Sequence, residues 1–169
     1  SGHYQTWHHE ANQKILAAAR RARAITVPSP WVAECYKRDM RRTPVVIGHG
    51  IELEQWQPVP EHQGYVLWNK NRIGDVCDTT PILRLARHGL DAVTTFAPGG
   101  VMLPDALRVI GLLPHHQMRE LVRYAAVYLA TTKETFGIGT LEALAAGVPV
   151  LGYNWGGTAA LGQHQVNGY

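Results

Sequence analysis

Two glutamates that flank a short glycine-containing segment are the residues of this chain best suited to chemistry. Glu134 and Glu142 stand on either side of Gly137 and Gly139. Glycine lets a ligand approach the backbone closely, and the unpaired amides of a helix that begins there would attract a diphosphate. Carboxylates repel phosphate, so the two acids are expected to accept hydrogen bonds from neutral sugar hydroxyls on either side of it. The pattern predicts a site for a nucleotide sugar, which consists of a hexose, a diphosphate and a ribose.

The elements that would hold these residues are predicted from hydrophobic patterning. A strand over 127–130 ends before Glu134, and a helix over 138–146 begins at the glycines and carries Glu142. Strands alternating with helices indicate an α/β fold, a Rossmann-like parallel sheet with helices on both faces, with ligands at the carboxyl ends of the strands. The other strands expected in this sheet cover 65–68, 92–97, 107–110 and 149–152, and the other helices cover 81–88 and 116–124.

Separate elements are expected in the first part of the chain. Ser29 can cap a helix that follows it, because its side chain can accept a hydrogen bond from an amide of the first turn. The polar stretch 55–64 contains two prolines and is typical of a linker, so a domain boundary is placed there. The helices expected before it cover 10–24 and 30–39, and the short strands cover 24–27 and 44–47.

Composition excludes several classes of protein. The 169 residues, 46% hydrophobic and 17% charged, suit a soluble globular protein of one domain, or one domain plus a piece of another. The formal charge of +3 comes mostly from arginines and lysines in the first 42 residues, where they alternate with alanine. This indicates a solvated helix face or attraction to an anionic membrane surface, and no nucleic-acid partner is expected.

The cysteines and histidines predict no metal centre. Cys35 and Cys77 form no CxxC pair and are interpreted as unreactive thiols, and without a signal peptide in the chain a cytoplasmic location is expected. His3, His8 and His9 have no carboxylate or cysteine set at ligand spacing. No metal and no cofactor are therefore expected.

The segments 134–137 and 142–150 resemble the glutamate, seven residues, glutamate motif of the large retaining glycosyltransferase family of the group 1 or family 4 type. This family includes sucrose synthase, glycogen synthase and phosphatidylinositol mannosyltransferase. The segments 24–34 and 45–52 are similar to the family's segments leading into its second domain, and 154–157 resembles its usual double glycine.

The resemblance implies roles for individual residues. Glu134 would hold the donor hexose hydroxyls and Glu142 the ribose hydroxyls. Lys70 and Arg72 would neutralise the diphosphate, although the family usually places an Arg and a Lys about five residues apart here; nearby Asp75 and Asp78 are unfavourable neighbours for phosphate. The catalytic residues implied are thus Glu134, Lys70 and Arg72. The other donor-binding residues implied are Phe136, Gly137, Ile138, Gly139, Thr140 and Leu141 on the loop and helix, with Ile110 and Gly111 at the edge of the base pocket.

The resemblance also implies a domain organisation. The main part would be the C-terminal domain of a GT-B glycosyltransferase, the type built from two facing Rossmann-like domains. Residues 58–169 would form this nucleotide-sugar-binding domain, truncated at its C-terminus, and 4–57 would be the end of the N-terminal acceptor domain and the crossing between domains. Residues 1–3 resemble the scar of a cleaved tag.

The function implied is transfer of a glycosyl group from a nucleoside-diphosphate sugar to an acceptor with retention of anomeric configuration. This chain would supply the donor-binding half and would bind nucleotide without turnover when alone. The acceptor, a sugar, lipid or small molecule, stays open, and the missing domain would allow peripheral membrane contact. Two alternatives remain, a nucleotide-sugar epimerase on the same scaffold and a noncatalytic nucleotide-binding module.

Overall fold

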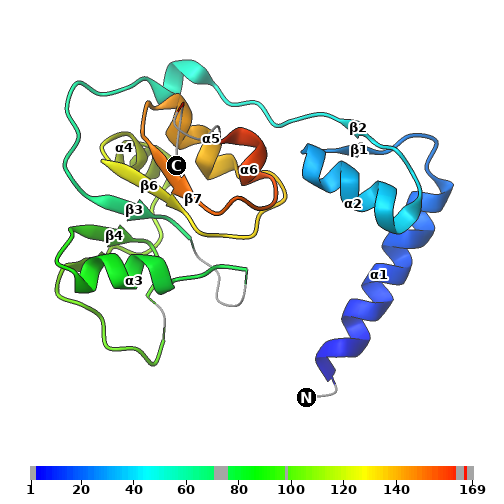
Figure 1. The fold of residues 1–169 in the computed structure, drawn as a ribbon, viewed down its shortest axis with the longest axis horizontal. Helices are drawn as coiled ribbons and strands as arrows, with labels where there is room; N and C mark the ends of the chain where they lie inside the picture. The colour runs from blue at the N-terminus through cyan, green and yellow to red at the C-terminus, as the bar shows by residue number, and fades with distance from the viewer. Residues whose placement is uncertain (1–2, 71–75, 98, 163–165, 167–169) are drawn as a thin grey trace. The chain divides into compact units, whose positions relative to one another are not determined.

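The computed structural model of the protein describes residues 3–70, 76–97, 99–162 and 166, with side chains from residue 9 onward. The chain divides into two compact units, residues 1–48 and 49–169. Figure 1 shows the elements of each unit. The two units are described separately below.

The first unit consists of two helices and a small parallel sheet. Ser29 caps α2 as predicted, because its hydroxyl accepts a hydrogen bond from the Val32 amide at 3.3 Å. Arg42 donates to the carbonyl oxygens of Ala19 and Ala22 at 2.9 and 3.0 Å, so its guanidinium satisfies the end of α1. The elements are α1 (His3–Arg21), β1 (Thr26–Val27), α2 (Pro30–Met40) and β2 (Val45–Val46).

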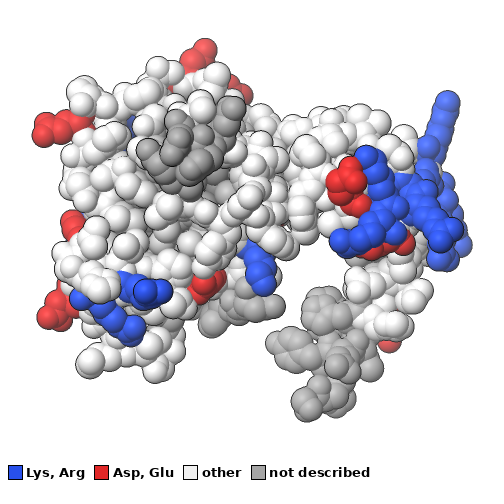
Figure 2. All heavy atoms as spheres, in the orientation of Figure 1, with Lys and Arg blue, Asp and Glu red and all other residues white. Residues whose placement is uncertain are grey.

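The excess positive charge of the chain belongs to this first unit. Residues 1–48 contain eight Lys and Arg against three Asp and Glu, whereas residues 49–169 contain eight against ten. Figure 2 shows a large group of blue basic side chains over this unit. Two of them, Lys37 and Arg38, pair with the acids Glu34 and Asp39 at 2.6 and 2.7 Å on the exposed face of α2. The second unit therefore has no net positive charge of its own.

The second unit is a five-stranded parallel sheet with the strand order β5-β4-β3-β6-β7. This confirms the predicted α/β fold. Two short elements were not predicted, η1 and α6, because four residues are too few to show a helical period. The elements of the unit are η1 (Leu53–Trp56), β3 (Val66–Trp68), α3 (Thr80–Arg87), β4 (Ala92–Thr94), β5 (Leu107–Val109), α4 (His115–Arg123), β6 (Val127–Ala130), α5 (Ile138–Ala145), β7 (Val150–Gly152) and α6 (Thr158–Leu161).

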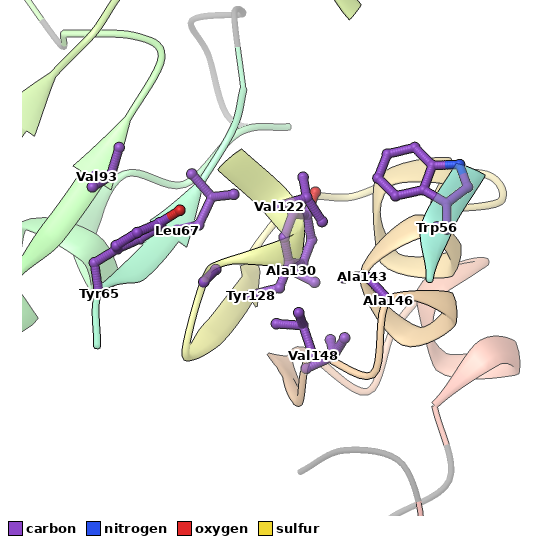
Figure 3. Packing of buried hydrophobic residues seen from close by; sticks show 12 residues of the cluster. Trp56, Tyr65, Leu67, Val93, Val122, Tyr128, Ala130, Ala143, Ala146 and Val148 are labelled. Atoms are coloured by element: carbon purple, nitrogen blue, oxygen red, sulfur yellow. The ribbon is translucent and has the colours of Figure 1, made fainter. Parts of the chain in front are cut away.

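Helices cover both faces of this sheet, so its central strands are buried on both sides. Along β3, Leu67 faces the cluster formed with α4 and α5, while Trp68 faces the cluster formed with α3. Both side chains are fully buried. Trp56 of η1 also packs into the first of these clusters, shown in Figure 3, and ties the segment after residue 48 to this unit. An uninterrupted apolar run is the expected signature of such a strand.

The order of the strands fixes where a ligand can bind. The chain leaves β3 toward β4 on one side and leaves β6 toward β7 on the other, although β3 and β6 are neighbours. Such a reversal opens a crevice between the carboxyl ends of the two strands, which is the usual ligand position in open α/β sheets. Residues that follow Trp68 and Ala130 must therefore meet at this crevice.

A pair of glycines holds the loop that follows β6. The Gly157 amide donates to the Glu134 carbonyl oxygen at 2.8 Å. A Cβ at Gly157 would collide with the backbone of Thr135 and Phe136, and one at Gly156 would lie 2.5 Å from the Glu134 carbonyl oxygen. Only glycine permits so close an approach, so the segment before α6 sets the position of the Glu134–Phe136 loop.

Substitution of Gly157 by alanine should disrupt this contact. We expect Gly157→Ala to lower the free energy of unfolding by about 1–3 kcal/mol, as overpacking of a buried contact does. Gly99→Ala is the matched control, because a Cβ there meets nothing within 4 Å, and it should change stability by less than about 0.5 kcal/mol. Chemical denaturation of both variants measures the difference; equal stabilities would contradict the proposed packing.

Candidate functional site

A cavity of about 460 Å³ lies at the carboxyl ends of β3 and β6. It occupies the crevice that the strand order predicts. Its wall is formed by the ends of these strands, the loop after β6 and the start of α5. The lining residues are His49, Asn69, Lys70, Val76, Cys77, Thr132, Lys133, Glu134, Thr135, Phe136, Gly137 and Ile138.

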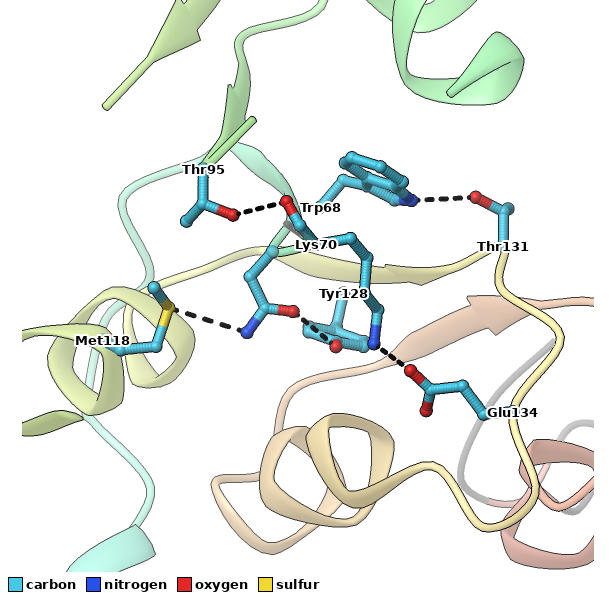
Figure 4. Close-up of polar contacts among 8 residues, drawn as sticks. Trp68, Lys70, Thr95, Met118, Tyr128, Thr131 and Glu134 are labelled. Atoms are coloured by element: carbon cyan, nitrogen blue, oxygen red, sulfur yellow. Dashed lines mark hydrogen bonds and ion pairs between the residues drawn. The ribbon is translucent and has the colours of Figure 1, made fainter. Parts of the chain in front are cut away.

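An ion pair joins the two sides of this cavity. The Lys70 Nζ lies 2.5 Å from the Glu134 Oε1, and the two side chains are 13% and 29% exposed (Figure 4). The Thr95 hydroxyl donates to the Lys70 carbonyl oxygen at 2.9 Å and fixes its backbone. Burial would lower the pKa of the Lys70 ammonium, but Tyr128 and Glu134 together raise it above its ordinary value. Lys70 therefore carries its positive charge at neutral pH.

The N-terminus of α5 opens beside this ion pair. Gly137 is its N-cap residue with φ of 94°, a conformation that favours glycine. No side chain caps this helix among the described residues, and its first turn contains no acid. The amides of that turn remain available to an anion, because they have no partner within the helix. Lys70 and the N-terminus of α5 together form an electropositive corner next to the Glu134 carboxylate.

Glu142 lies on α5, one turn after Ile138, and does not line the cavity. Its side chain is 15% exposed, and its Oε1 lies 3.7 Å from His115 Nε2 at the start of α4. Burial raises the pKa of Glu142, although His115 and Lys70 counteract part of that effect. His115 also packs edge-on against Trp56, with the ring centroids 6.0 Å apart. Keeping a carboxylate charged in such a buried position costs free energy, and a hydrogen-bond donor would stabilise the charge.

The structure brings together some of the predicted site residues and separates others. Lys70, Glu134, Phe136, Gly137 and Ile138 line the cavity. The predicted residues that do not line it are Gly139, Thr140, Leu141 and Glu142 on α5, together with Ile110 and Gly111 after β5; Arg72 and Asp75 lie outside the described residues.

Asp78 does not interfere with the cavity. Its Oδ2 accepts a hydrogen bond from the Tyr153 hydroxyl at 2.5 Å, and its Oδ1 accepts one from the Thr80 amide at 3.0 Å. These bonds, with the Tyr153 bond first, lower the pKa of Asp78. The carboxylate is directed into this network and is absent from the cavity lining, so its expected repulsion of phosphate is weaker than the sequence suggests.

Several lining residues were not predicted as site residues. The His49 ring contacts the Phe136 ring edge-on, with the centroids 4.9 Å apart. Cys77 pairs with Thr132 through an isolated antiparallel bridge, and the Lys133 amide donates to the Val76 carbonyl oxygen at 2.8 Å. These contacts join segments far apart in the sequence, so no local pattern could have revealed them.

Two features are absent from the described residues. No helix among them is long and apolar enough to cross a bilayer. Within the same residues no group of three or more His, Cys, Asp or Glu side chains is arranged to hold a metal ion.

Comparison with protein families identifies the region that contains both glutamates. Residues 100–169 match the family model described as glycosyl transferases group 1. This matched region covers less than half of the chain. It includes Glu134, Glu142 and the whole of α5, whereas Lys70 lies before it. A search of curated protein sequences finds no significant match to the chain.

Several solved structures share the fold of the chain. HepE from Anabaena, in complex with UDP and glucose, has a TM-score of 0.74 at 18% identity over 90% of this chain and 50% of that chain. Sucrose-phosphate synthase from Thermosynechococcus elongatus has a TM-score of 0.74 at 20% identity over 90% of this chain and 46% of that chain. The pneumococcal O-GlcNAc transferase GtfA, in complex with UDP and GlcNAc, has a TM-score of 0.65 at 16% identity over 89% of this chain and 34% of that chain. The chain thus spans half or less of the length of each.

The buried Glu142 predicts a stability change that depends on pH. Its folded-state pKa is raised, so wild-type protein loses stability as pH rises through the titration of this carboxylate. We expect Glu142→Gln to be as stable as wild type at about pH 4 and more stable at about pH 7, because these pH values bracket a raised glutamate pKa.

Thermal unfolding measured from acid to neutral pH checks this expectation. The control is Glu120→Gln, because Glu120 is 47% exposed and pairs with Arg123 at 2.9 Å on the surface of α4. It should give no gain that grows with pH. A Glu142→Gln variant that becomes less stable than wild type as pH rises would contradict the assignment.

Proposed function

We propose that this chain binds a nucleoside-diphosphate sugar in the cavity and takes part in transfer of the glycosyl group to an acceptor with retention of anomeric configuration. One observation carries the proposal, the Lys70–Glu134 pair across the crevice beside the open N-terminus of α5. This pair places an anion-binding corner next to a carboxylate that can accept hydrogen bonds from sugar hydroxyls. The family of residues 100–169 and the fold support the same conclusion.

The diphosphate is assigned to Lys70 and the first turn of α5. When the bond between the anomeric carbon and the diphosphate oxygen breaks, negative charge grows on the leaving group. A fixed ammonium and helix amides stabilise that charge without a metal ion, because they point at it before the reaction begins. Arg72 is proposed as a second cation. This division of roles requires no metal and no cofactor.

The hexose is assigned to Glu134. A carboxylate has two oxygens that can each accept hydrogen bonds, and Lys70 contacts only Oε1. The other oxygen, Oε2, lies on the side of Gly137, where an added Cβ would come within 3.5 Å of it. Glu134 can thus hold Lys70 and a sugar hydroxyl at the same time. This arrangement places the hexose against the electropositive corner.

The nucleoside is assigned to the region beyond the first turn of α5. Glu142 would accept hydrogen bonds from the ribose hydroxyls, which offset the cost of its burial. Gly139, Thr140 and Leu141 would form the rest of the wall around the nucleoside. Ile110 and Gly111 would lie at the edge of the base pocket. Because HepE and GtfA were solved with UDP, uridine nucleotides are the first donors to test.

The proposed role is that of a donor-binding half. Since the chain spans at most half of each matched structure compared above, the acceptor site is proposed to lie in residues outside it. The acceptor is a sugar, lipid or small molecule, and peripheral membrane contact is proposed for that missing part. An epimerase on the same scaffold would instead release free nucleoside diphosphate from the donor with no acceptor present.

Loss of the ammonium at residue 70 should weaken nucleotide binding. We expect Lys70→Met to raise the Kd for UDP, or for whichever of UDP, GDP and ADP wild type prefers, by about ten- to a hundredfold, the value of a charge-assisted hydrogen bond. Isothermal titration measures this change. Lys37→Met is the control, because Lys37 forms a comparable 2.6 Å pair with Glu34 in the first unit.

Loss of the carboxylate at residue 134 should affect the sugar more than the nucleotide. We expect Glu134→Gln to keep its affinity for the free nucleoside diphosphate and to lose the additional affinity for the sugar-bearing form. Glu120→Gln should change neither. If wild type binds none of the three nucleotides or their glucose conjugates, the proposed function is wrong.

A further inference from the structure

The side chain of Tyr128 is buried beneath the candidate site and has not been assigned a role. Tyr128 lies on β6 and is fully buried. Its ring belongs to the cluster between the sheet and helices α4 and α5. An apolar side chain would suffice for that packing, so the buried hydroxyl needs a separate explanation.

The hydroxyl is held at the point where β3 ends. It donates to Asn69 Oδ1 at 2.6 Å, and Asn69 in turn approaches the Met118 sulfur of α4 with its Nδ2 at 3.6 Å (Figure 4). Because its O–H is used in the hydrogen bond to Asn69, the phenolic oxygen can still accept a hydrogen bond from another donor through its lone pairs. The Lys70 ammonium lies beside this oxygen and interacts with it electrostatically, so the ammonium can supply that donor (Figure 4).

The same hydroxyl touches the first turn of α5. A Cβ at Gly139 would collide with the Tyr128 hydroxyl, so the helix approaches this oxygen as closely as glycine allows. Tyr128 thus contacts the end of β3 and the start of α5 at once. Burial raises the pKa of Tyr128, with Lys70 counteracting part of that rise, so the hydroxyl stays protonated and neutral at pH 7.

We propose that Tyr128 is a positioning residue, whose hydroxyl holds the Lys70 ammonium and the α5 N-terminus at the spacing that a diphosphate requires. The Lys70 ammonium has three protons, and Glu134 accepts only one of them through Oε1. Without the phenolic oxygen the ammonium would move toward Glu134 and away from the helix amides. This inference rests on the proposed function, since it assigns the diphosphate to Lys70.

The chain offers a matched control for a buried tyrosine hydroxyl. Tyr65 is also buried, belongs to the same hydrophobic cluster, and donates to the Leu121 carbonyl oxygen at 2.6 Å. Its bond lies at the end of α4 and outside the cavity lining. Tyr65→Phe and Tyr128→Phe each remove one buried hydrogen bond, so they separate a general loss of stability from an effect on the site.

The first experiment needs no ligand. Thermal unfolding of Tyr128→Phe, Lys70→Met and the double variant forms a double-mutant cycle, and a second cycle uses Tyr65→Phe. We expect the Tm changes to be non-additive in the first cycle and additive in the second. Additive changes in the first cycle would overturn the proposal, whatever the protein binds.

The second experiment measures binding of UDP, or of whichever of UDP, GDP and ADP the wild-type protein prefers. We expect Tyr128→Phe to raise the Kd about three- to tenfold, the range of one neutral hydrogen bond, with Tyr65→Phe unchanged. Asn69→Ala removes the acceptor of the same hydroxyl and should also weaken binding, which keeps the test valid if Tyr128→Phe folds poorly. Wild-type affinity in both variants would overturn the proposal; failure of wild type itself to bind would instead reject the proposed function, while the first experiment still decides whether Tyr128 positions Lys70.

Discussion

The arrangement of the second unit depends on keeping one largely buried ammonium charged. Lys70 lies at a crevice between two parallel strands, where water is largely excluded, and a charge there requires partners. Glu134 supplies an opposite charge and Tyr128 a neutral oxygen, each from β6 or the loop after it. The free protein thus holds a cation at the place where the strand order allows a ligand. An anionic ligand would find this charge already in position.

The loop that supplies Glu134 is held from both sides, which explains how so short a segment can keep a defined shape. On one side, residues 76–78 pair with 131–133 through the Cys77–Thr132 bridge. On the other side, Gly156 and Gly157 press directly against its backbone. A ligand that binds this loop need not order it first, and such preorganisation favours both affinity and transition-state stabilisation.

Local patterns predicted the sheet, its flanking helices and the loop with its glutamates, because each of these depends on residues close in the sequence. Patterns could not reveal that Lys70 meets Glu134, that His49 packs on Phe136, or that Tyr128 reaches Asn69, since these contacts join distant segments. The positions of η1 and α6 were missed because each is a single short turn. Glu142 was predicted to bind the ribose hydroxyls, which stays a prediction; it lies next to His115 and does not line the cavity.

The separation of charge between the two units bears on how an anion would reach the cavity. Because residues 49–169 carry more acids than bases, this unit has no net positive charge that would draw a diphosphate from solution. Recognition must then act over a few ångströms, where the sheltered Lys70 is hardly screened by dissolved ions. The ionic strength of the surroundings should therefore alter the capture of such a ligand far less than it does for proteins that rely on electrostatic steering.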